Sequence, residues 1–346
     1  MSARGARWRV AVAGSGFGAK VHVPAFRAQG RFDVVALVSP SNATRVARER
    51  EVERAFSSLD EMFGEIDVDV VSVAAPPFAH RDAVLACLAR GKHVLCEKPF
   101  ALSVAQAQEM LAASERAGTV SAIAHEFRYL PSRQALHELI VNGHLGPLRD
   151  IEYTVVNTFL RAAFERPDSW WFDRERGGGL AGAYMSHLVD TANWLAGRAP
   201  NHATGFVRTA NPLRTYGGER FTSTVDDGAF ALIDYGEGLV GRIAVDATRP
   251  VDSAVLAVHG ETRAAVASGP SILEGTMFTV DEEETAELQL LANPHEKLAS
   301  IHPNVPPFVS LLDEFAKALD GEPAALPTFA DGVATQRVLA AVGYGT

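Results

Sequence analysis

The sequence predicts an α/β protein in which a doubly wound parallel sheet precedes a second α/β domain with a mostly antiparallel sheet. Two observations carry this prediction. Over the first third of the chain, continuous apolar runs alternate with helical patterns, which is typical of parallel strands covered on both faces. Beyond residue 148, apolar and polar residues alternate within each run, which indicates antiparallel strands with one covered face.

Length and charge bound the possible functions. The 346 residues exceed one ordinary core, so we expect two domains. The 32 Lys and Arg against 42 Asp and Glu give a net charge of −10, which argues against a nucleic-acid partner. No apolar run is long enough for a membrane span, and the start of the chain resembles no targeting segment, so we expect a cytoplasmic protein. Cys87 and Cys96 form neither a disulfide framework nor a metal-binding spacing.

The elements of the first third follow one another as strand and helix. Apolar β-rich runs are separated by helical patterns that end at glycines such as Gly91 and Gly118. We expect strands at 7–14, 32–39, 68–76, 92–97 and 119–127, and helices at 20–30, 41–51, 79–91 and 103–118.

The remainder of the chain contains alternating strand patterns around one apolar helix. We expect a first domain at residues 1–123 and a second at 124–346, with two helices at the end of the chain. The strand patterns lie at 148–159, 228–236, 238–248 and 253–260, and the helix at 179–197.

The stretch GSGFGA, residues 14–19, predicts a dinucleotide site because it follows the first strand and precedes the first helix. Gly14 permits a tight turn, Gly16 allows a pyrophosphate to approach the backbone, Phe17 lies in the same loop, and Ala19 allows close helix packing. A tight turn without a ligand is the alternative for such a motif taken alone.

The end of the second strand bears on the choice of cofactor. NAD-binding folds usually place an acidic residue there, which binds the ribose 2′-hydroxyl. This chain has Ser39, and Arg45 follows six residues later, so a 2′-phosphate meets no carboxylate and has a possible cationic partner. We therefore favour NADP over NAD. In the alternative interpretation Ser39 only starts a turn and Arg45 is a solvated charge.

The stretch VLCEKPF, residues 94–100, places two opposite charges directly after a buried strand. Ligands of parallel sheets bind outside the carboxyl ends of the strands. We therefore expect Glu97 and Lys98 to lie at the ligand crevice.

Six motifs together make the chain similar to the glucose–fructose oxidoreductase/inositol dehydrogenase/rhizopine catabolism (Gfo/Idh/MocA) family of NAD(P)-dependent oxidoreductases. The resemblance spans about residues 8–343. It is carried by GSGFGA, AAPPFAH, GKHVLCEKP, FRYLPSRQALHELIVNGHLGPL, GGGLAGAYMSHLVD and PTFADGVATQRVLAAV.

The resemblance implies an N-terminal Rossmann domain and a C-terminal domain with an open sheet, whose outer face forms homodimers or homotetramers. It implies hydride transfer between the cofactor and a hydroxyl or carbonyl group of a sugar, cyclitol or related molecule. Lys98 then contacts the reacting oxygen, and His187 is the acid/base. The cofactor-binding set is Gly14, Gly16, Phe17, Ser39, Arg45, Ala75, Pro76, His80, Glu97 and Lys98.

One position departs from the family pattern. Members with a Lys/Asp/His set carry an aspartate four residues before the histidine, and Ala183 stands there in this chain. Without that carboxylate, the imidazole loses a group that would stabilise its protonated form and is the better acid, so we expect the reductive direction, with Tyr184 as an alternative proton donor. Asp190, one turn beyond His187, either orients it or is a structural charge.

Further residues are expected to contact the substrate, and a second function stays open. The expected substrate set is Lys98, His125, Arg128, Trp170 and His187, with no metal. The Ala183 departure keeps a second function open, in which the protein is a cofactor-binding sensor or regulator with weak or no catalysis.

Overall fold

The computed structural model describes residues 7–281 and 283–345, and the chain divides into two compact units. The first comprises residues up to Ala101, Ala105–Tyr129 and Asn293–Gly332. The second comprises Leu102–Val104, Leu130–Ala292 and the residues from Val333 onward. The chain thus returns to the first unit after it has built most of the second.

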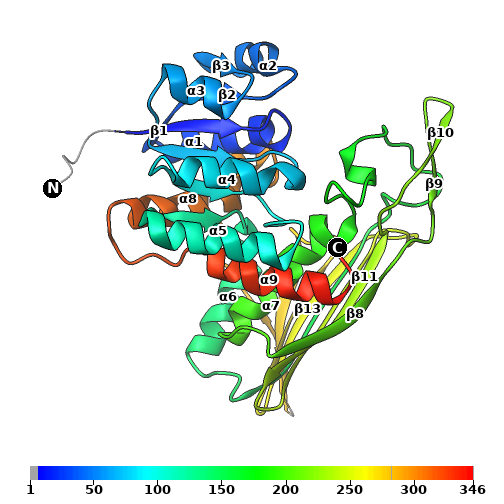
Figure 1. Ribbon diagram of the computed structural model, residues 1–346. Coiled ribbons are helices and arrows are strands. Elements are labelled where there is room, and N and C mark those ends of the chain that lie inside the picture. The colour runs from blue at the N-terminus through cyan, green and yellow to red at the C-terminus, as the bar shows by residue number, and fades with distance from the viewer. Residues whose placement is uncertain (1–6, 282, 346) are drawn as a thin grey trace. The chain divides into compact units, whose positions relative to one another are not determined.

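A six-stranded parallel sheet forms the centre of the first unit (Figure 1). The strand order β3-β2-β1-β4-β5-β6 reverses direction between β1 and β4, as in doubly wound nucleotide-binding sheets. The prediction of a doubly wound parallel sheet is therefore confirmed. The strands are β1 (Trp8–Ala13), β2 (Phe32–Val38), β3 (Arg54–Phe56), β4 (Val70–Val73), β5 (His93–Cys96) and β6 (Ser121–Ile123).

Helical segments connect these strands and cover the sheet (Figure 1). The segment from β3 to α3 lacks a counterpart in the sequence prediction, because a strand of three residues is too short to show a period. The helical segments are η1 (Gly18–His22), α1 (Val23–Gln29), α2 (Ala43–Glu49), α3 (Leu59–Glu65), η2 (Pro77–Ala79), α4 (His80–Leu88), α5 (Val104–Ala117), η3 (Glu126–Tyr129), η6 (Glu296–Ser300) and α8 (Val305–Leu319).

Helix α8 belongs to the core of the first unit although it lies near the end of the chain. It packs against α1 and η3. Phe308 and Phe315 are fully buried, and the Phe315 ring stacks on Phe32 with 6.3 Å between centroids. Burial of each such side chain stabilises the fold by about 1.5–3 kcal/mol.

An eight-stranded mixed sheet forms the second unit (Figure 1). Its order is β16-β15-β14-β13-β7-β12-β11-β8, and every neighbouring pair is antiparallel except β12 with β7. The predicted mostly antiparallel sheet is therefore confirmed. The strands are β7 (Leu148–Val156), β8 (His202–Arg208), β11 (Gly228–Gly236), β12 (Leu239–Asp246), β13 (Ser253–Gly260), β14 (Ala264–Gly269), β15 (Thr276–Val280) and β16 (Thr285–Leu288), with β9 (Leu213–Tyr216) and β10 (Glu219–Thr222) as a separate hairpin.

The two faces of this sheet differ in burial. Along β11, Ile233 and Tyr235 are buried, whereas Leu232 and Asp234, which alternate with them, are exposed. Helix α7 (Ser186–Ala196) packs on β7 and β12, and its side chains are almost all buried. The other helical segments are α6 (Pro131–Val141), η4 (Trp170–Phe172), η5 (Ala181–Met185) and α9 (Phe329–Ala341).

Within the described part of the chain, no helix is both long and apolar enough to span a membrane.

Candidate functional site

Two glycines of the loop after β1 differ in their surroundings: the fold requires a glycine at Gly14, whereas Gly16 faces open space. Gly14 has a φ of 142°, and a Cβ there would lie 2.1 Å from the carbonyl oxygen of Ala74. A Cβ added at Gly16 would meet nothing within 4 Å. The loop therefore has room for a group that approaches its backbone closely at Gly16, as a pyrophosphate does.

Close packing between the loop and the sheet occurs at Gly18. A Cβ there would come 2.9 Å from Cγ1 of Val12, whereas the sequence analysis assigned this role to Ala19, which is also buried. Phe17 is partly buried, and its ring meets the edge of His22 with 5.7 Å between centroids.

Small polar side chains surround the end of β2. Ser39 is buried; its hydroxyl donates to Oδ1 of Asn42 at 2.8 Å and lies 3.0 Å from Oγ of Ser15. Arg45 is exposed on α2 and forms an ion pair with Glu49 at 2.6 Å. Such exposed i,i+4 pairs contribute only about 0.3–0.5 kcal/mol, so the guanidinium is easily redirected to a ligand.

His80 links the ends of two neighbouring strands. Its ring is fully buried, with Nε2 2.8 Å from the Ala75 carbonyl and Nδ1 3.0 Å from the Pro99 carbonyl. Burial lowers the pKa of His80. His80 therefore holds Ala75, which follows β4, and Pro99, which follows β5, in fixed positions. Pro76 directly precedes η2, the short helical turn that connects β4 to α4.

Glu97 is the end of a buried hydrogen-bonded chain. His22 Nε2 lies 3.0 Å from Oε1 of Glu97, and His22 Nδ1 lies 2.7 Å from the Ser72 hydroxyl. Burial disfavours the Glu97 carboxylate, but the hydrogen bond with His22 and the charges of His22 and Lys98 outweigh it, so the pKa of Glu97 is lowered. The strand therefore ends in an ionised carboxylate that the His22 ring holds in place.

Lys98 follows Glu97 at the same strand end and is half-buried. Its backbone N–H donates to Oε2 of Glu97 at 3.1 Å, and its peptide bond to Pro99 is cis. The positive charge of Lys98 is among the influences that keep Glu97 ionised.

Glu126, at the start of η3, is a second buried carboxyl group in the first unit. It is 0% exposed, and Asn304 Nδ2 donates to its Oε1 at 3.2 Å. Burial and then the charge of Glu97 raise the pKa of Glu126 to about 8. Neither Glu126 nor His22 is among the site residues that the sequence predicts.

His125 and Arg128, predicted to contact substrate, are both buried beside Glu126 in the chain. Arg128 forms an ion pair with Asp331 at 3.2 Å. This pair connects η3 to the first turn of α9, so the structure shows an anchoring contact for Arg128.

In the second unit, consecutive glycines bring the chain close to two neighbours before η5. A Cβ at Gly178 would lie 2.2 Å from the Trp171 carbonyl oxygen, and one at Gly179 would lie 2.4 Å from Oδ1 of Asp226. Oδ2 of Asp226 accepts the Ala181 N–H at 2.6 Å. Burial raises the pKa of Asp226 to about 6, although that backbone hydrogen bond opposes the rise.

His187 is buried in the first turn of α7, with 3% of its surface exposed. Asp190 is buried one turn further along the helix, and Ala183 lies one turn before His187 in η5. Burial raises the pKa of Tyr184, and the nearby charge of Arg166 opposes this rise. The two candidate proton donors, His187 and Tyr184, therefore both lie in the helical segment that follows Gly178 and Gly179.

Tyr184 lies at one end of an aromatic cluster. The Phe159 ring lies 5.5 Å from the Tyr184 ring and 6.4 Å from the Trp171 ring, and the Arg166 guanidinium lies 4.5 Å from the centre of the Trp171 ring. Trp171 makes these contacts, and substrate contact by its neighbour Trp170 stays a prediction. The signal in the sequence was the pair of tryptophans, which does not distinguish its two members.

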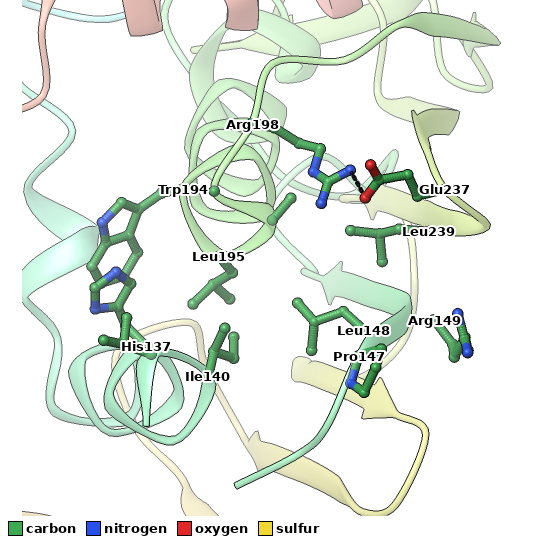
Figure 2. Close-up of a pocket in the computed structure, with 13 residues that line it drawn as sticks. His137, Ile140, Pro147, Leu148, Arg149, Trp194, Leu195, Arg198, Glu237 and Leu239 are labelled. Atoms are coloured by element: carbon green, nitrogen blue, oxygen red, sulfur yellow. Dashed lines mark hydrogen bonds and ion pairs between the residues drawn. The ribbon is translucent and has the colours of Figure 1, made fainter. Parts of the chain in front are cut away.

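The second unit also contains a hollow of about 300 Å³, shown in Figure 2. His137 and Trp194 stack on one side with 4.2 Å between ring centroids, and Arg198 pairs with Glu237 across the rim at 2.7 Å. None of the predicted site residues lines it.

The predicted residues thus form two sets. The glycine loop, Ser39, His80, Glu97, Lys98, His125 and Arg128 belong to the first unit, and Trp170, Tyr184 and His187 belong to the second.

A doubly wound sheet with a glycine loop at the end of its first strand defines the class of dinucleotide-binding proteins. The family model described as "Oxidoreductase family, NAD-binding Rossmann fold" matches residues 8–125, and the Gfo/Idh/MocA C-terminal domain model matches residues 133–266. The chain belongs to the Gfo/Idh/MocA family of oxidoreductases.

Two relatives and one solved structure illustrate its similarities. An uncharacterised oxidoreductase of Synechocystis is 34% identical over 197 residues, 56% of this chain and 53% of that protein. The 1,5-anhydro-D-fructose reductase of Ensifer adhaerens is 32% identical over 214 residues, 59% of this chain and 62% of that protein. The matches thus span less than two thirds of these relatives.

Levoglucosan dehydrogenase in complex with NADH has the same fold. Its TM-score is 0.84 at 20% identity, with 97% of this chain and 96% of that chain covered.

Proposed function

We propose that the protein transfers hydride between a nicotinamide cofactor and a hydroxyl or carbonyl group of a sugar, cyclitol or related small molecule. The observation that carries this proposal is that the open glycine loop at Gly16 and Lys98 both follow the carboxyl ends of strands in one parallel sheet. The relative that is a 1,5-anhydro-D-fructose reductase supports a sugar-like substrate.

The chain's own residues supply binding and proton transfer. The cofactor, when bound, accepts or donates the hydride. The Lys98 ammonium stabilises negative charge that develops on the substrate oxygen, and His187 donates or accepts the proton at that oxygen. The chain from Ser72 through His22 to Glu97 fixes the strand end that carries Lys98.

The proposed physiological direction is reduction. Without a carboxylate at Ala183, no acidic group one turn earlier on the helix stabilises the protonated form of His187. An imidazole in that setting gives its proton readily to the oxygen of a reduced carbonyl. Tyr184 is the alternative donor.

The proposed cofactor is NADP. The hydroxyls of Ser39 and Ser15 and the amide of Asn42 lie at the end of β2, where an acidic residue would repel a 2′-phosphate. Fluorescence titration should give tighter binding of NADPH than of NADH, and Ser39→Asp should reverse the order. Equal or stronger NADH binding by the unmodified protein would contradict the choice of NADP.

We propose a homodimer or homotetramer formed through the outer face of the second sheet. Phe206 and Leu232 point from this face with 59% and 54% exposure, and Phe230 lies against Phe206. Light scattering should show an oligomer that Leu232→Glu dissociates. Leu291→Glu, in an exposed loop, is the matched control. A monomeric unmodified protein would overturn the proposal.

The alternative function, a cofactor-binding regulator, is favoured by Ala183 alone. A panel of sugars, cyclitols and ketoses, incubated with NADPH or NADP⁺ and followed at the nicotinamide absorbance, separates the two functions. Turnover of any member supports the enzyme. Tight cofactor binding without turnover across the panel would favour the regulator.

A further inference from the structure

Two buried carboxyl groups lie at the ends of neighbouring parallel strands. Glu97 follows β5, and Glu126 follows β6 by three residues. The Ala124 N–H donates to the Cys96 carbonyl at 2.8 Å, which holds the two strand ends side by side. Each side chain is at least nine-tenths buried.

The two carboxyl groups have different partners. Oε1 of Glu97 interacts with the His22 ring and Oε2 with the Lys98 N–H, whereas Oε1 of Glu126 accepts the Asn304 amide. Oε2 of Glu126 is buried and has no hydrogen-bond partner within the described chain.

The charged groups around Glu126 do not compensate for its burial. Glu97 opposes ionisation of Glu126 and Lys98 favours it, while the neutral Asn304 contributes a hydrogen bond. On its own segment, Arg128 is already paired with Asp331. With its pKa raised to about 8, Glu126 is a neutral carboxylic acid at pH 7.

Glu126 follows a strand of the half-sheet that serves the nicotinamide end of a dinucleotide. The half-sheet β1–β3 carries the glycine loop and Ser39, which serve the adenosine half of a dinucleotide. The other half-sheet, β4–β6, serves the second mononucleotide, which bears the nicotinamide. This step rests on the proposed function.

We propose that Glu126 carries a proton that the oxidised nicotinamide displaces and the reduced nicotinamide leaves in place. The oxidised ring bears a fixed positive charge, which favours a nearby carboxylate, whereas the reduced ring is neutral. On binding of the oxidised cofactor, the O–H bond at Oε2 breaks, the proton goes to solvent and the carboxylate remains. No electron is transferred in this step.

The exchange makes Glu126 a specificity-determining residue for the redox state of the cofactor. Near neutral pH, the oxidised form must expel a proton to bind, whereas the reduced form binds without this requirement. Glu126 therefore favours retention of the reduced cofactor, in agreement with the reductive direction.

Calorimetric titration with NADP⁺ and NADPH between pH 6 and 9 tests the proposal. We expect the ratio of NADP⁺ to NADPH affinity to rise with pH below pH 8, by up to about tenfold per pH unit. The 2′-phosphate is common to both forms and cancels from this ratio. At pH 7, buffers of different ionisation enthalpy should show release of up to about one proton with NADP⁺ and none with NADPH.

Glu126→Gln keeps the shape and neutral charge of the acid but has no proton to lose. It should make the affinity ratio independent of pH and abolish proton release. Glu115→Gln, an exposed change on α5, is the matched control and should leave both unchanged. An unchanged pH dependence in Glu126→Gln, or a flat ratio in the unmodified protein, would overturn the inference while cofactor binding itself stands.

Thermal unfolding without cofactor separates this failure from failure of the proposed function. A raised carboxyl pKa predicts that the unmodified protein loses stability relative to Glu126→Gln as pH rises from about 5 to 8. If this trend is seen but neither dinucleotide binds, the proposed function fails and the inference falls with it.

Discussion

Lys98 is the residue on which the proposed chemistry depends most. Replacement by Met removes the ammonium and keeps much of the apolar stem, so we expect kcat to fall by at least about a hundredfold, as when a group that stabilises the developing oxyanion is lost. Cofactor affinity should change little, because the charge acts mainly in the transition state.

Lys92→Met is the matched control, since Lys92 directly precedes the same strand and pairs with Asp67 at the surface. Steady-state kinetics with the best substrate of the panel checks both variants. If Lys98→Met lowers the melting temperature but leaves turnover intact, Lys98 is a structural residue.

Substitutions at His187 and Ala183 test which group gives the proton to the substrate oxygen. We expect His187→Ala to remove most reductase activity without unfolding the protein, because another proton donor must replace the imidazole. Ala183→Asp places a carboxylate one turn earlier and should move the pH limb of the reduction rate upward, since the carboxylate stabilises the protonated ring. Near-full turnover in His187→Ala would transfer the role to another group, with Tyr184 the first to examine.

At the scale of the element, substitutions in the glycine loop distinguish effects on folding from effects on cofactor binding. Gly14→Ala should prevent correct folding because its Cβ would lie 2.1 Å from a backbone carbonyl oxygen. Gly16→Ala meets no neighbour within 4 Å, so the melting temperature should hold while dinucleotide affinity falls at least about tenfold, the pyrophosphate then meeting a methyl group.

Gly64→Ala in α3 is the corresponding control. Its Cβ also meets nothing within 4 Å, and it should raise stability by about 0.5–1 kcal/mol without changing affinity. Calorimetry for stability and fluorescence titration for binding check all three variants. Unchanged dinucleotide affinity in Gly16→Ala would place the pyrophosphate elsewhere.

Asp226 makes the start of η5 sensitive to pH. Its pKa lies at about 6 in the folded protein against 3.8 for the free group, so the folded state binds the proton more tightly. Stability from this group is fully present below pH 3.8 and is lost as pH rises through 6.

Asp226→Asn should therefore gain stability relative to the unmodified protein between pH 4 and pH 7, by on the order of 2–3 kcal/mol. Urea unfolding at both pH values measures the difference. A variant that loses the same stability at both pH values would show that the carboxylate serves only as the hydrogen-bond acceptor for Ala181.

Strands were predictable from the sequence where they form long apolar runs. Strands β1, β2, β4 and β5 were anticipated because each is a continuous apolar run next to a clear helix. Strands β8 and β14–β16 were not, since β8 has no buried residue and the others are short or rich in small and polar residues. The sheet, rather than the local sequence, stabilises those strands through their neighbours.

At the scale of the whole molecule, the strand-end residues of the site were predictable and their partners were not. Glu97 and Lys98 stand at a strand end that the sequence displays. The partner of Glu97 is His22, 75 positions earlier, and the partner of Glu126 is Asn304, 178 positions later. The fold brings these side chains together, so no spacing in the sequence indicates them.

The division into Lys98 in one unit and Trp170, Tyr184 and His187 in the other has a consequence for experiments. The proposed hydride transfer uses residues of both units, so we expect either unit alone to be inactive. The full chain is therefore the material for every kinetic test.

Transfer of deuterium tests the central claim most directly. NADPH carrying deuterium at the reactive C4 position is incubated with the full chain and the best carbonyl substrate of the panel, and the product is analysed by mass spectrometry. We predict one deuterium bound to carbon in each product molecule, and strongly reduced transfer in Lys98→Met. If NADPH binds but no panel substrate acquires deuterium, the protein is not the hydride-transfer enzyme proposed for it.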